Sequence, residues 1–233
     1  MSLNIATHRT VLFQILKDIY SDTTIAPFLG FKGGTAAVLF YGLDRFSVDL
    51  DFDLLDETKQ DSVFEQLIKI VARHGEIKES HIKRFSLFCL LSYEDNARNV
   101  KVEVNRRQFG SKYEIKTYLG ISMPVMVQAD MFAHKLMAMH ERISKTSRDI
   151  YDVWFFLKNR FPINKEIVEK RSGVAFDQLI DKCINQLEKM NNRRILDGMG
   201  EFLTERQKSA ARAGLRQETI ALLALRKEQQ SDS

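Results

Sequence analysis

The chain has 233 residues, of which 44% are hydrophobic and 16 are phenylalanine, so it can bury the core of one domain or of two closely packed domains. Its formal net charge of +4 permits a phosphate-bearing partner without establishing one. No stretch approaches the roughly 20 apolar residues of a membrane span, and the N-terminus lacks a signal-peptide pattern, so we expect a soluble, cytoplasmic protein without membrane association.

The cysteines and histidines give no zinc pattern. Cys89 and Cys183 lie in apolar or helical stretches without CxxC spacing, which argues against a disulfide framework and against a cysteine zinc site. The five histidines are scattered and form no HxxxH pair.

The N-terminal segment predicts a helix, a tight loop and a second helix. Residues 8–20 place apolar side chains three and four positions apart, as on one face of an amphipathic helix that covers a sheet. This face comprises Val11, Leu12, Ile15, Leu16 and Ile19. Gly33 and Gly34 then precede an apolar run, a pattern typical of a loop that leads into a buried helix, and Gly42 is placed to end that helix.

Alternating side chains predict the strands of a mixed α/β N-terminal half. Residues 46–54 alternate between apolar side chains and a face of Ser47 and three aspartates. Residues 57–73 return to helical spacing, and residues 83–93 and 99–106 read as two strands joined by the polar turn EDNARN.

Beyond Pro124 the pattern is wholly helical. Helices are expected near residues 129–143, 147–159, 164–171, 175–191 and 200–228. We therefore predict an α+β fold with two closely packed parts, a mixed-sheet core over residues 1–124 and a helical C-terminal domain over 125–233 that completes the active site.

Two aspartates on the strand at 46–54 predict a cation site. Side chains two apart on a strand share a face, so Asp49 and Asp51 can converge on a cation while Leu50 enters the core. Magnesium suits such a cluster and often binds as a pair at phosphoryl-transfer sites. A DxD alone is often a solvated strand edge, so the neighbouring motifs decide the interpretation.

The sequence KGGTA lies just upstream of the aspartates. Gly33 and Gly34 allow the backbone to approach phosphate oxygens, the following helix N-terminus favours anions, and Thr35 adds a hydroxyl donor. A Gly-Gly pair by itself is more often an ordinary turn. The combination of this turn, a short helix and a DxD strand is a stronger signal than either part.

Glu103 is the candidate third acid. In VKVEVNRR the valines share one face, which leaves Lys101, Glu103 and Asn105 on the other. Glu103 can complete a three-carboxylate cluster with Asp49 and Asp51. The alternative is an exposed strand face on which Glu103 only pairs with Lys101 or Arg106.

The run FKGGTAAVLFYGLDRFSVDLDFDLL resembles the opening motif of the AbiEii/AbiGii toxin family. This family lies within the DNA polymerase β-like nucleotidyltransferase superfamily, whose signature is a Gly-Ser or Gly-Thr turn followed by DxD. The resemblance implies a polymerase β-like mixed sheet, with Asp49, Asp51 and Glu103 as catalytic metal ligands. It also implies nucleotide binding by Lys32, Gly33, Gly34, Thr35, Arg45 and Ser47.

A second block, HKLMAMHERISKTSRDIYDVWFFL, is similar to the second motif of the same family. The matching positions are Lys135, Arg142, Arg148, Asp149 and Asp152. The resemblance implies that Lys135 contacts the nucleotide triphosphate and that Asp149 takes part in catalysis.

Geometry places a condition on this second motif. One straight helix would separate Lys135 from Asp149 by about 21 Å, so a turn at residues 144–147 is needed, and Ser147 can cap the next helix. Alternatively, Lys135 is a solvated helix residue and Asp149 offsets its helix dipole. Arg142 and Asp152 are expected to form structural ion pairs.

A third feature is the basic stripe of the last helix, where Lys208, Arg212 and Arg216 recur every four residues near Arg206. The stripe can follow an RNA backbone, but a solvated face is the more frequent case, and neighbouring glutamates dilute the charge.

The resemblance implies a toxin of a bacterial toxin–antitoxin or phage-defence system, with a cognate antitoxin encoded nearby. With two Mg²⁺ ions as cofactors, it would transfer a nucleoside monophosphate from a nucleoside triphosphate to an acceptor hydroxyl, expected to be the 3′ end of tRNA. Two alternatives remain open. The chain could modify a protein or a small molecule on the same fold, or it could bind nucleotide or RNA without catalysis.

Overall fold

The computed structural model describes residues 4–95, 97–143 and 145–231. The chain forms two compact units. The first contains the described residues up to Gln108 together with Lys112–Val127, and the second contains Phe109–Ser111 and the described residues from Gln128 onward.

The first unit is built on a seven-stranded sheet in the order β3-β4-β5-β2-β1-β7-β6. The strands are β1 (Leu29–Lys32), β2 (Asp49–Leu54), β3 (Glu76–Ile82), β4 (Ser86–Ser92), β5 (Val100–Asn105), β6 (Tyr113–Tyr118) and β7 (Ile121–Met126). β2 runs parallel to β5 and antiparallel to β1, and β1 runs parallel to β7. The remaining neighbours are antiparallel. The sheet is therefore mixed, and the predicted α+β class is confirmed.

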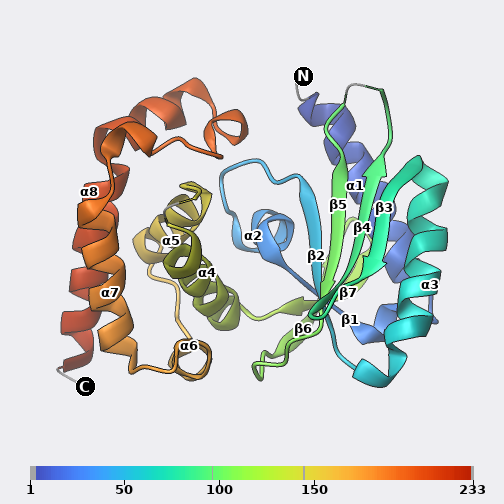
Figure 1. The fold of residues 1–233 in the computed structure, drawn as a ribbon, viewed down its shortest axis with the longest axis horizontal. Coiled ribbons are helices and arrows are strands. Elements are labelled where there is room, and N and C mark those ends of the chain that lie inside the picture. The colour runs from blue at the N-terminus through green and yellow to red at the C-terminus, as the bar shows by residue number, and fades with distance from the viewer. Residues whose placement is uncertain (1–3, 96, 144, 232–233) are drawn as a thin grey trace. The chain divides into compact units, whose positions relative to one another are not determined.

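Helices cover both faces of this sheet. α1 (Ile5–Ser21) and α3 (Gln60–Val71) pack side by side on one face, and α2 (Gly33–Tyr41) lies on the other (Figure 1). The apolar side chains of β2, Leu50, Phe52 and Leu54, are buried. Because side chains alternate along a strand, the aspartates of β2 lie on the opposite face from this apolar set.

The predicted helices of the first unit are confirmed. α1 buries Leu12, Ile15, Leu16 and Ile19 as expected, whereas Val11 is only half-buried and His8 is fully buried. Gly42 ends α2 in the left-handed conformation, with φ of 71°. Two short 3-10 turns, Glu57–Lys59 and Ala72–His74, extend α3 at its two ends, so that together they cover the predicted range. Another 3-10 turn, Ala26–Phe28, precedes β1.

The three strands expected in this unit are present, although β2 begins only at Asp49. Asn96, in the expected turn between β4 and β5, lies outside the described residues. Four further strands were not predicted, and one of them, β1, spans only four residues. β3 and β6 are the two edges of the sheet and are mostly exposed, so they lack the alternation of a half-buried strand. β7 contains Pro124, a residue that argues against a strand interior.

The second unit is helical, as expected. Its helices are α4 (Gln128–Arg142), α5 (Arg148–Lys158), α6 (Lys165–Ser172), α7 (Phe176–Lys189) and α8 (Glu205–Ser231), with 3-10 turns Asn192–Arg194 and Gly200–Phe202. The rings of Phe132 and Phe156 stack in the core with centroids 5.3 Å apart. α4 and α5 are joined by the expected turn, of which Ser144 lies outside the described residues. Among the described helices of the whole chain, none is long and apolar enough to cross a membrane.

Candidate active site

The pairing of β2 with β5 places the candidate acids side by side. Asp51 lies directly opposite Glu103, and Asp49 lies opposite Lys101, in a parallel register. Partners in register share a face of the sheet, so Asp49, Asp51 and Glu103 form one acidic group on two neighbouring strands. The face is the one on which α2 lies.

Lys101 sits within this acidic group. Its Nζ atom is 2.9 Å from Oε2 of Glu103 and 3.2 Å from Oδ1 of Asp51. Burial disfavours the charged form of Lys101, but the negative charges of Asp51, Asp49 and Glu103 outweigh this effect and raise the pKa of its ammonium group. Burial likewise disfavours the charged form of Glu103, yet Lys101 lowers the pKa of its carboxyl group. The ammonium group is thus held as a cation between two carboxylates.

The glycine turn at the start of α2 touches the same acids. Gly33 has a φ of +81°, and a Cβ atom at this position would lie 2.9 Å from Cγ of Asp51. At Gly34, a Cβ atom would lie 2.6 Å from Oγ of Ser47 and 3.2 Å from Nη2 of Arg45. Only residues without a side chain allow this close approach, so both glycines are required by the packing of the turn on β2.

Thr35, Ser47 and Arg45 connect the turn to the loop before β2. The Thr35 hydroxyl lies 3.0 Å from Oγ of Ser47 and donates a hydrogen bond of 2.5 Å to the carbonyl of Asp49. Arg45 is buried and donates to the carbonyl of Phe46 at 2.8 Å. These bonds fix the N-terminus of α2 relative to the first aspartate of the DxD.

Lys32 forms an ion pair with a different acid, Asp53. Its Nζ atom is 2.5 Å from Oδ1 of Asp53, which also accepts a hydrogen bond of 2.6 Å from Asn105. The Tyr113 hydroxyl donates to the other carboxylate oxygen of Asp53. Asp53 therefore lies on the same strand as the DxD aspartates but is neutralised by partners from three other strands.

In the second unit, the second motif forms two ion pairs between α4 and α5. Lys135 pairs with Asp152 at 2.7 Å, and Arg142 pairs with Asp149 at 2.8 Å. Arg142 and Asp152 do form ion pairs, as expected, and their partners are the two residues to which the resemblance assigns a role at the active site. The turn between the helices brings Asp149 to Arg142, seven residues before it.

The side chains of Asp149 and Ser147 differ in their hydrogen bonds. Asp149 is buried, and its Oδ2 atom has no hydrogen-bond partner among the described residues. The expectation that Ser147 caps α5 is wrong. Ser147 occupies the N-cap position but has a helical backbone, and its hydroxyl donates to the carbonyl of Arg194 at 2.8 Å.

The acidic group fits a divalent cation in its chemistry. Over the described residues, no group of three or more His, Cys, Asp or Glu side chains is positioned to hold a metal ion. However, the Lys101 ammonium group already takes the place of a cation between Asp51 and Glu103. Carboxylate oxygens are the ligands that Mg²⁺ prefers, so the donor set suits this ion.

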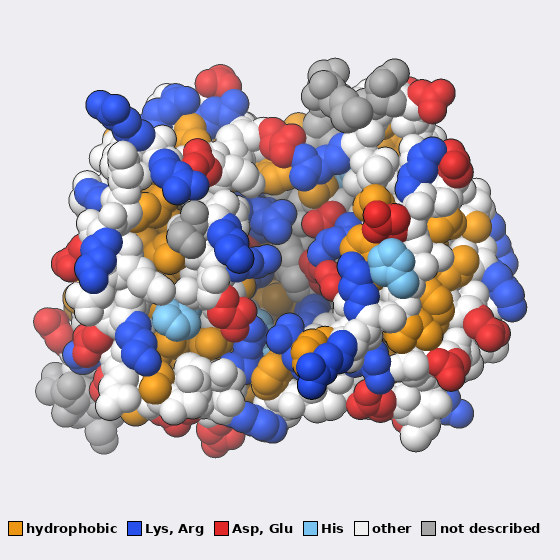
Figure 2. Space-filling view, viewed as in Figure 1, with side chains coloured by type: hydrophobic (Ala, Val, Ile, Leu, Met, Phe, Trp, Pro, Cys, Tyr) orange, Lys and Arg blue, Asp and Glu red, His pale blue; other side chains and the backbone are white. Residues whose placement is uncertain are grey.

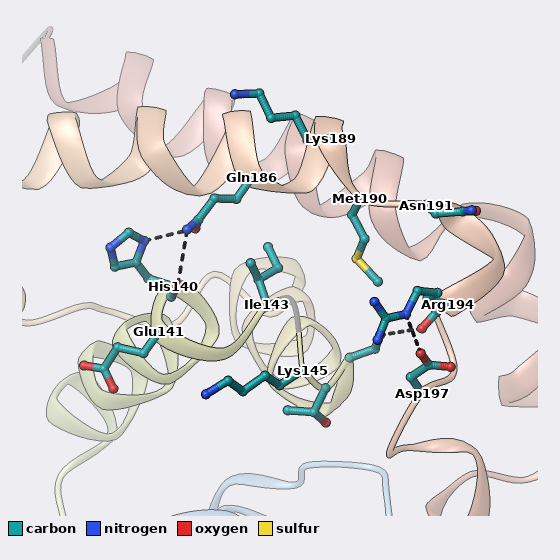
Figure 3. Close-up of a pocket in the computed structure, with 12 residues that line it drawn as sticks. His140, Glu141, Ile143, Lys145, Gln186, Lys189, Met190, Asn191, Arg194 and Asp197 are labelled. Atoms are coloured by element: carbon teal, nitrogen blue, oxygen red, sulfur yellow. Dashed lines mark hydrogen bonds and ion pairs between the residues drawn. The ribbon is translucent and has the colours of Figure 1, made fainter.

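A cavity of about 500 Å³ lies in the second unit, between α4, α7 and the segment after α7. Figure 3 shows Ile143 and Met190 extending into it from opposite sides, with the ion pair of Arg194 and Asp197 at one end. Lys145 and Lys189 also line it, and neither has an ion pair within the described part of the chain. A neighbouring cavity adds Arg193 and Arg212.

The basic stripe of α8 is partly used for structure. Arg216 donates to the carbonyl of Met190 at 2.6 Å and so caps the end of α7, and Lys208 pairs with Glu205. On the face shown in Figure 2, Lys and Arg side chains are interspersed with Asp and Glu over the helical unit. The stripe is therefore no continuous row of free cations.

Two residues of the first unit were not assigned a site role from sequence. Lys101 was considered only as an ion-pair partner of Glu103, although its position two residues before Glu103 places it on the same face. Tyr113 lies on an unpredicted strand, so its contact with Asp53 had no signal in the local pattern.

The model of the family described as "Nucleotidyl transferase AbiEii toxin, Type IV TA system" matches residues 14–223. The comparison with curated proteins gives no match. Two solved structures from Helicobacter pylori share the fold. One is a protein assigned as a nucleotidyltransferase, with TM-score 0.61, 18% identity and coverage of 100% of this chain and 98% of that one. The other, JHP933, has TM-score 0.56, 16% identity and coverage of 99% of both chains.

These likenesses, at less than a quarter identity, show the fold, whereas the family model spans most of the sequence and includes both motifs. The chain belongs to the AbiEii family of nucleotidyltransferase toxins of type IV toxin–antitoxin systems.

Proposed function

We propose that the protein is a Mg²⁺-dependent toxin that transfers a nucleoside monophosphate from a nucleoside triphosphate to an RNA hydroxyl, with the 3′ end of tRNA as the acceptor. The observation that carries this proposal is the acidic group of Asp49, Asp51 and Glu103, which lies against the glycine turn at the N-terminus of α2. Such a site combines a position for cations with a position for phosphates.

The nucleotide binds with its phosphates at the glycine turn. The backbone amides of Gly33 and Gly34, at the positive end of α2, attract anions. Arg45 and Ser47 support this turn from the loop before β2. We assign Thr35 to hold the turn in place, because its hydroxyl donates to the backbone of Asp49.

Asp49, Asp51 and Glu103 would hold the metal, as a two-ion site. When bound, Mg²⁺ neutralises phosphate charge and polarises the α-phosphate. The acceptor hydroxyl attacks the α-phosphorus in line, which forms a new phosphate ester bond and breaks the α–β anhydride bond. Pyrophosphate leaves, and the proton of the hydroxyl passes to solvent.

The second motif contributes Lys135 and Asp149. We propose that the Lys135 ammonium group contacts the triphosphate and that Asp149 acts at the active site. The buried Oδ2 atom of Asp149 supports this role, because a buried carboxylate oxygen without a partner costs stability and calls for a functional explanation. Lys32 is bound by Asp53, and we propose that it meets the nucleotide only indirectly, by positioning β1 below the turn.

An RNA acceptor is supported by the basic cavity of the second unit. Lys145 and Lys189 line it and, within the described residues, have no carboxylate partner. Free cations attract a phosphate backbone, so this surface favours RNA over a neutral small molecule. Membership of the family also supports a cognate antitoxin as partner and a role in phage defence.

A label-transfer experiment tests the reaction. The protein is incubated with Mg²⁺ and each nucleoside triphosphate labelled at the α-phosphate, in the presence of total RNA, total protein or a small-molecule extract. We expect label in the RNA fraction, at the tRNA 3′ end, and only background label with Asp49→Asn/Asp51→Asn. Asp61→Asn, on the exposed side of α3, serves as the matched control and should retain transfer. Label in protein or in small molecules would refute the RNA acceptor, and transfer by the double variant would refute the catalytic assignment.

Growth tests the toxin role. Induced expression in a bacterial host should arrest growth with the wild type and not with the double variant. Co-expression of the cognate antitoxin should restore growth. Unchanged growth with an active enzyme would contradict this part of the proposal. Protection against phage is measured as plating efficiency in the same strains.

A further inference from the structure

The position of Lys101 is unusual among the strand lysines of the first unit. It contacts carboxylates on two different strands, Glu103 on β5 and Asp51 on β2, at 2.9 Å and 3.2 Å. Lys116 on β6 offers a comparison, because it is equally exposed and its carboxylate partner among the described residues is Glu114 of its own strand. An ion pair on a single strand is a common surface feature that contributes little to stability. Lys101 instead bridges the two strands that carry the candidate metal ligands.

Lys101 also reduces the electrostatic repulsion within the acidic group. Asp49, Asp51 and Glu103 lie on two neighbouring strands, and like charges placed this closely repel each other. The ammonium group of Lys101 lies between two of these carboxylates and offsets part of their charge. Because the ammonium group lies between Asp51 and Glu103, a cation that bridges these two carboxylates must compete with it.

We propose that Lys101 is a built-in counter-ion of the metal site, which holds the carboxylates of Asp51 and Glu103 in the metal-free protein and is displaced from them when a divalent cation binds. The inference rests on the proposed function, since it takes the acidic group as the metal site. Lys101 is thus a positioning residue that sets the metal affinity. Its released ammonium group becomes available beside the phosphates of the nucleotide.

Direct binding of Mn²⁺ tests the competition. Titration calorimetry is carried out on the full chain without nucleotide, for the wild type, Lys101→Met, Lys101→Arg and Lys116→Met. Removal of the competing charge should tighten Mn²⁺ binding by about tenfold in Lys101→Met, as expected for the loss of one partly exposed ion-pair interaction and of charge repulsion. Lys101→Arg retains the charge and Lys116→Met is the matched control, so both should bind Mn²⁺ as the wild type does.

Thermal unfolding provides a second measurement. In EDTA, the midpoint should be lower for Lys101→Met than for Lys116→Met, because Asp51 and Glu103 then lose the ammonium group that lies between them. Saturating Mn²⁺ should remove this difference. An equal loss with and without Mn²⁺ would indicate an ordinary structural ion pair and would overturn the proposal.

Lysine labelling tests the displacement of Lys101 in the wild-type protein, so the result does not depend on whether a variant folds. Reductive methylation with formaldehyde, followed by mass spectrometry, reports how accessible each amine is. Modification of Lys101 should rise several-fold in saturating Mg²⁺, whereas modification of Lys116 should stay constant. Unchanged labelling of Lys101 in protein that binds the metal would overturn the displacement.

The outcomes separate the two proposals. If the wild type binds Mn²⁺ and Lys101→Met binds it equally or more weakly, the role of Lys101 is wrong while the metal-dependent function stands. If neither protein binds Mn²⁺ with or without nucleotide, both the metal site and the displacement are wrong.

Discussion

Gly33→Ala is the substitution that most directly tests the contact between the glycine turn and the acidic group. Gly33 has a φ of +81°, which costs an L-residue about 1–2 kcal/mol. In addition, the new Cβ atom would overlap the carboxylate of Asp51 and lie 2.7 Å from its Cβ atom, whereas ordinary contacts are 3.4–4 Å. Rotation of the side chain cannot relieve the second contact, so Asp51 and the turn must separate by about 1 Å. We expect a loss of about 2–3 kcal/mol in unfolding free energy. Because we propose Asp51 as a metal ligand, a displacement of about 1 Å also predicts a loss of about 100-fold in the rate of transfer.

The chain offers a matched control for the backbone strain. Gly42 ends the same helix with a φ of +71°, and a Cβ atom there would meet nothing within 4 Å. Gly42→Ala should therefore cost only about 1 kcal/mol of stability and leave the rate unchanged. Gly34→Ala tests the other side of the turn, because its Cβ atom would press on Ser47, and it should reduce nucleotide affinity more than the rate.

Two assays measure these effects. Urea unfolding followed by circular dichroism gives the free energy of unfolding, and single-turnover transfer of labelled nucleoside monophosphate gives the rate with saturating nucleotide and metal. Both are measured well below the unfolding midpoint of the least stable variant. Equal rates for Gly33→Ala and Gly42→Ala would show that the contact with Asp51 is not needed for catalysis, and would refute the reasoning.

Three further predictions concern buried groups. Burial lowers the pKa of His8 from 6.5, so the folded protein binds fewer protons than the unfolded chain and its stability should fall as the pH drops below about 6.5. Urea titrations should show that His8→Gln loses this dependence, and an unchanged slope of unfolding free energy against pH would refute the prediction. Lys135→Met should lower the free energy of unfolding by about 3 kcal/mol, because the buried Asp152 then loses its ammonium partner. Adding Asp152→Asn to the same chain should recover most of this stability, and additive losses in this double-mutant cycle would exclude the coupling. Burial raises the pKa of Cys89 to about 11 and that of Cys183 to about 12, so both thiols should react with a disulfide reagent only on unfolding; rapid reaction of the native protein would contradict their burial.

The strands β2 and β5 at the centre of the sheet were predictable because one face of each is buried. β2 and β5 alternate between buried apolar side chains and polar ones, a pattern that their sequence displays directly. The edge strands β3 and β6 have no such buried face, so only their pairing with β4 and β7 defines them. Local sequence therefore predicts a strand where alternation over several residues displays a buried face. It fails for the exposed edges, for the four-residue strand β1 and for β7 with its proline.

The helices of the second unit were predictable for the same reason, but their ion pairs were not. Apolar spacing defines α4 and α5, and the turn between them follows from the distance argument about Lys135 and Asp149. Which cation meets which carboxylate depends on the angle and rotation of the two helices. The sequence contains no signal for this, so the pairs Lys135 with Asp152 and Arg142 with Asp149 had to be observed.

The three aspartates of β2 show why the spacing of acids alone does not identify a metal site. Asp49, Asp51 and Asp53 share one face at equal spacing, so alternation treats them alike. Their neighbours separate them. Asp53 is bound by Lys32 and by two polar side chains, and its side chain is only 10% exposed, so replacing these partners with a metal would break several buried interactions.

Asp51, by contrast, lies beside a glycine that leaves its carboxylate uncovered, and its side chain is 28% exposed. The lysine that it contacts is a flexible cation that also reaches Glu103, so a divalent ion can take its place between the two carboxylates when this side chain turns away. The same strand thus carries a structural aspartate, Asp53, and a proposed metal ligand, Asp51, and what distinguishes them is how deeply each carboxylate is buried among its partners.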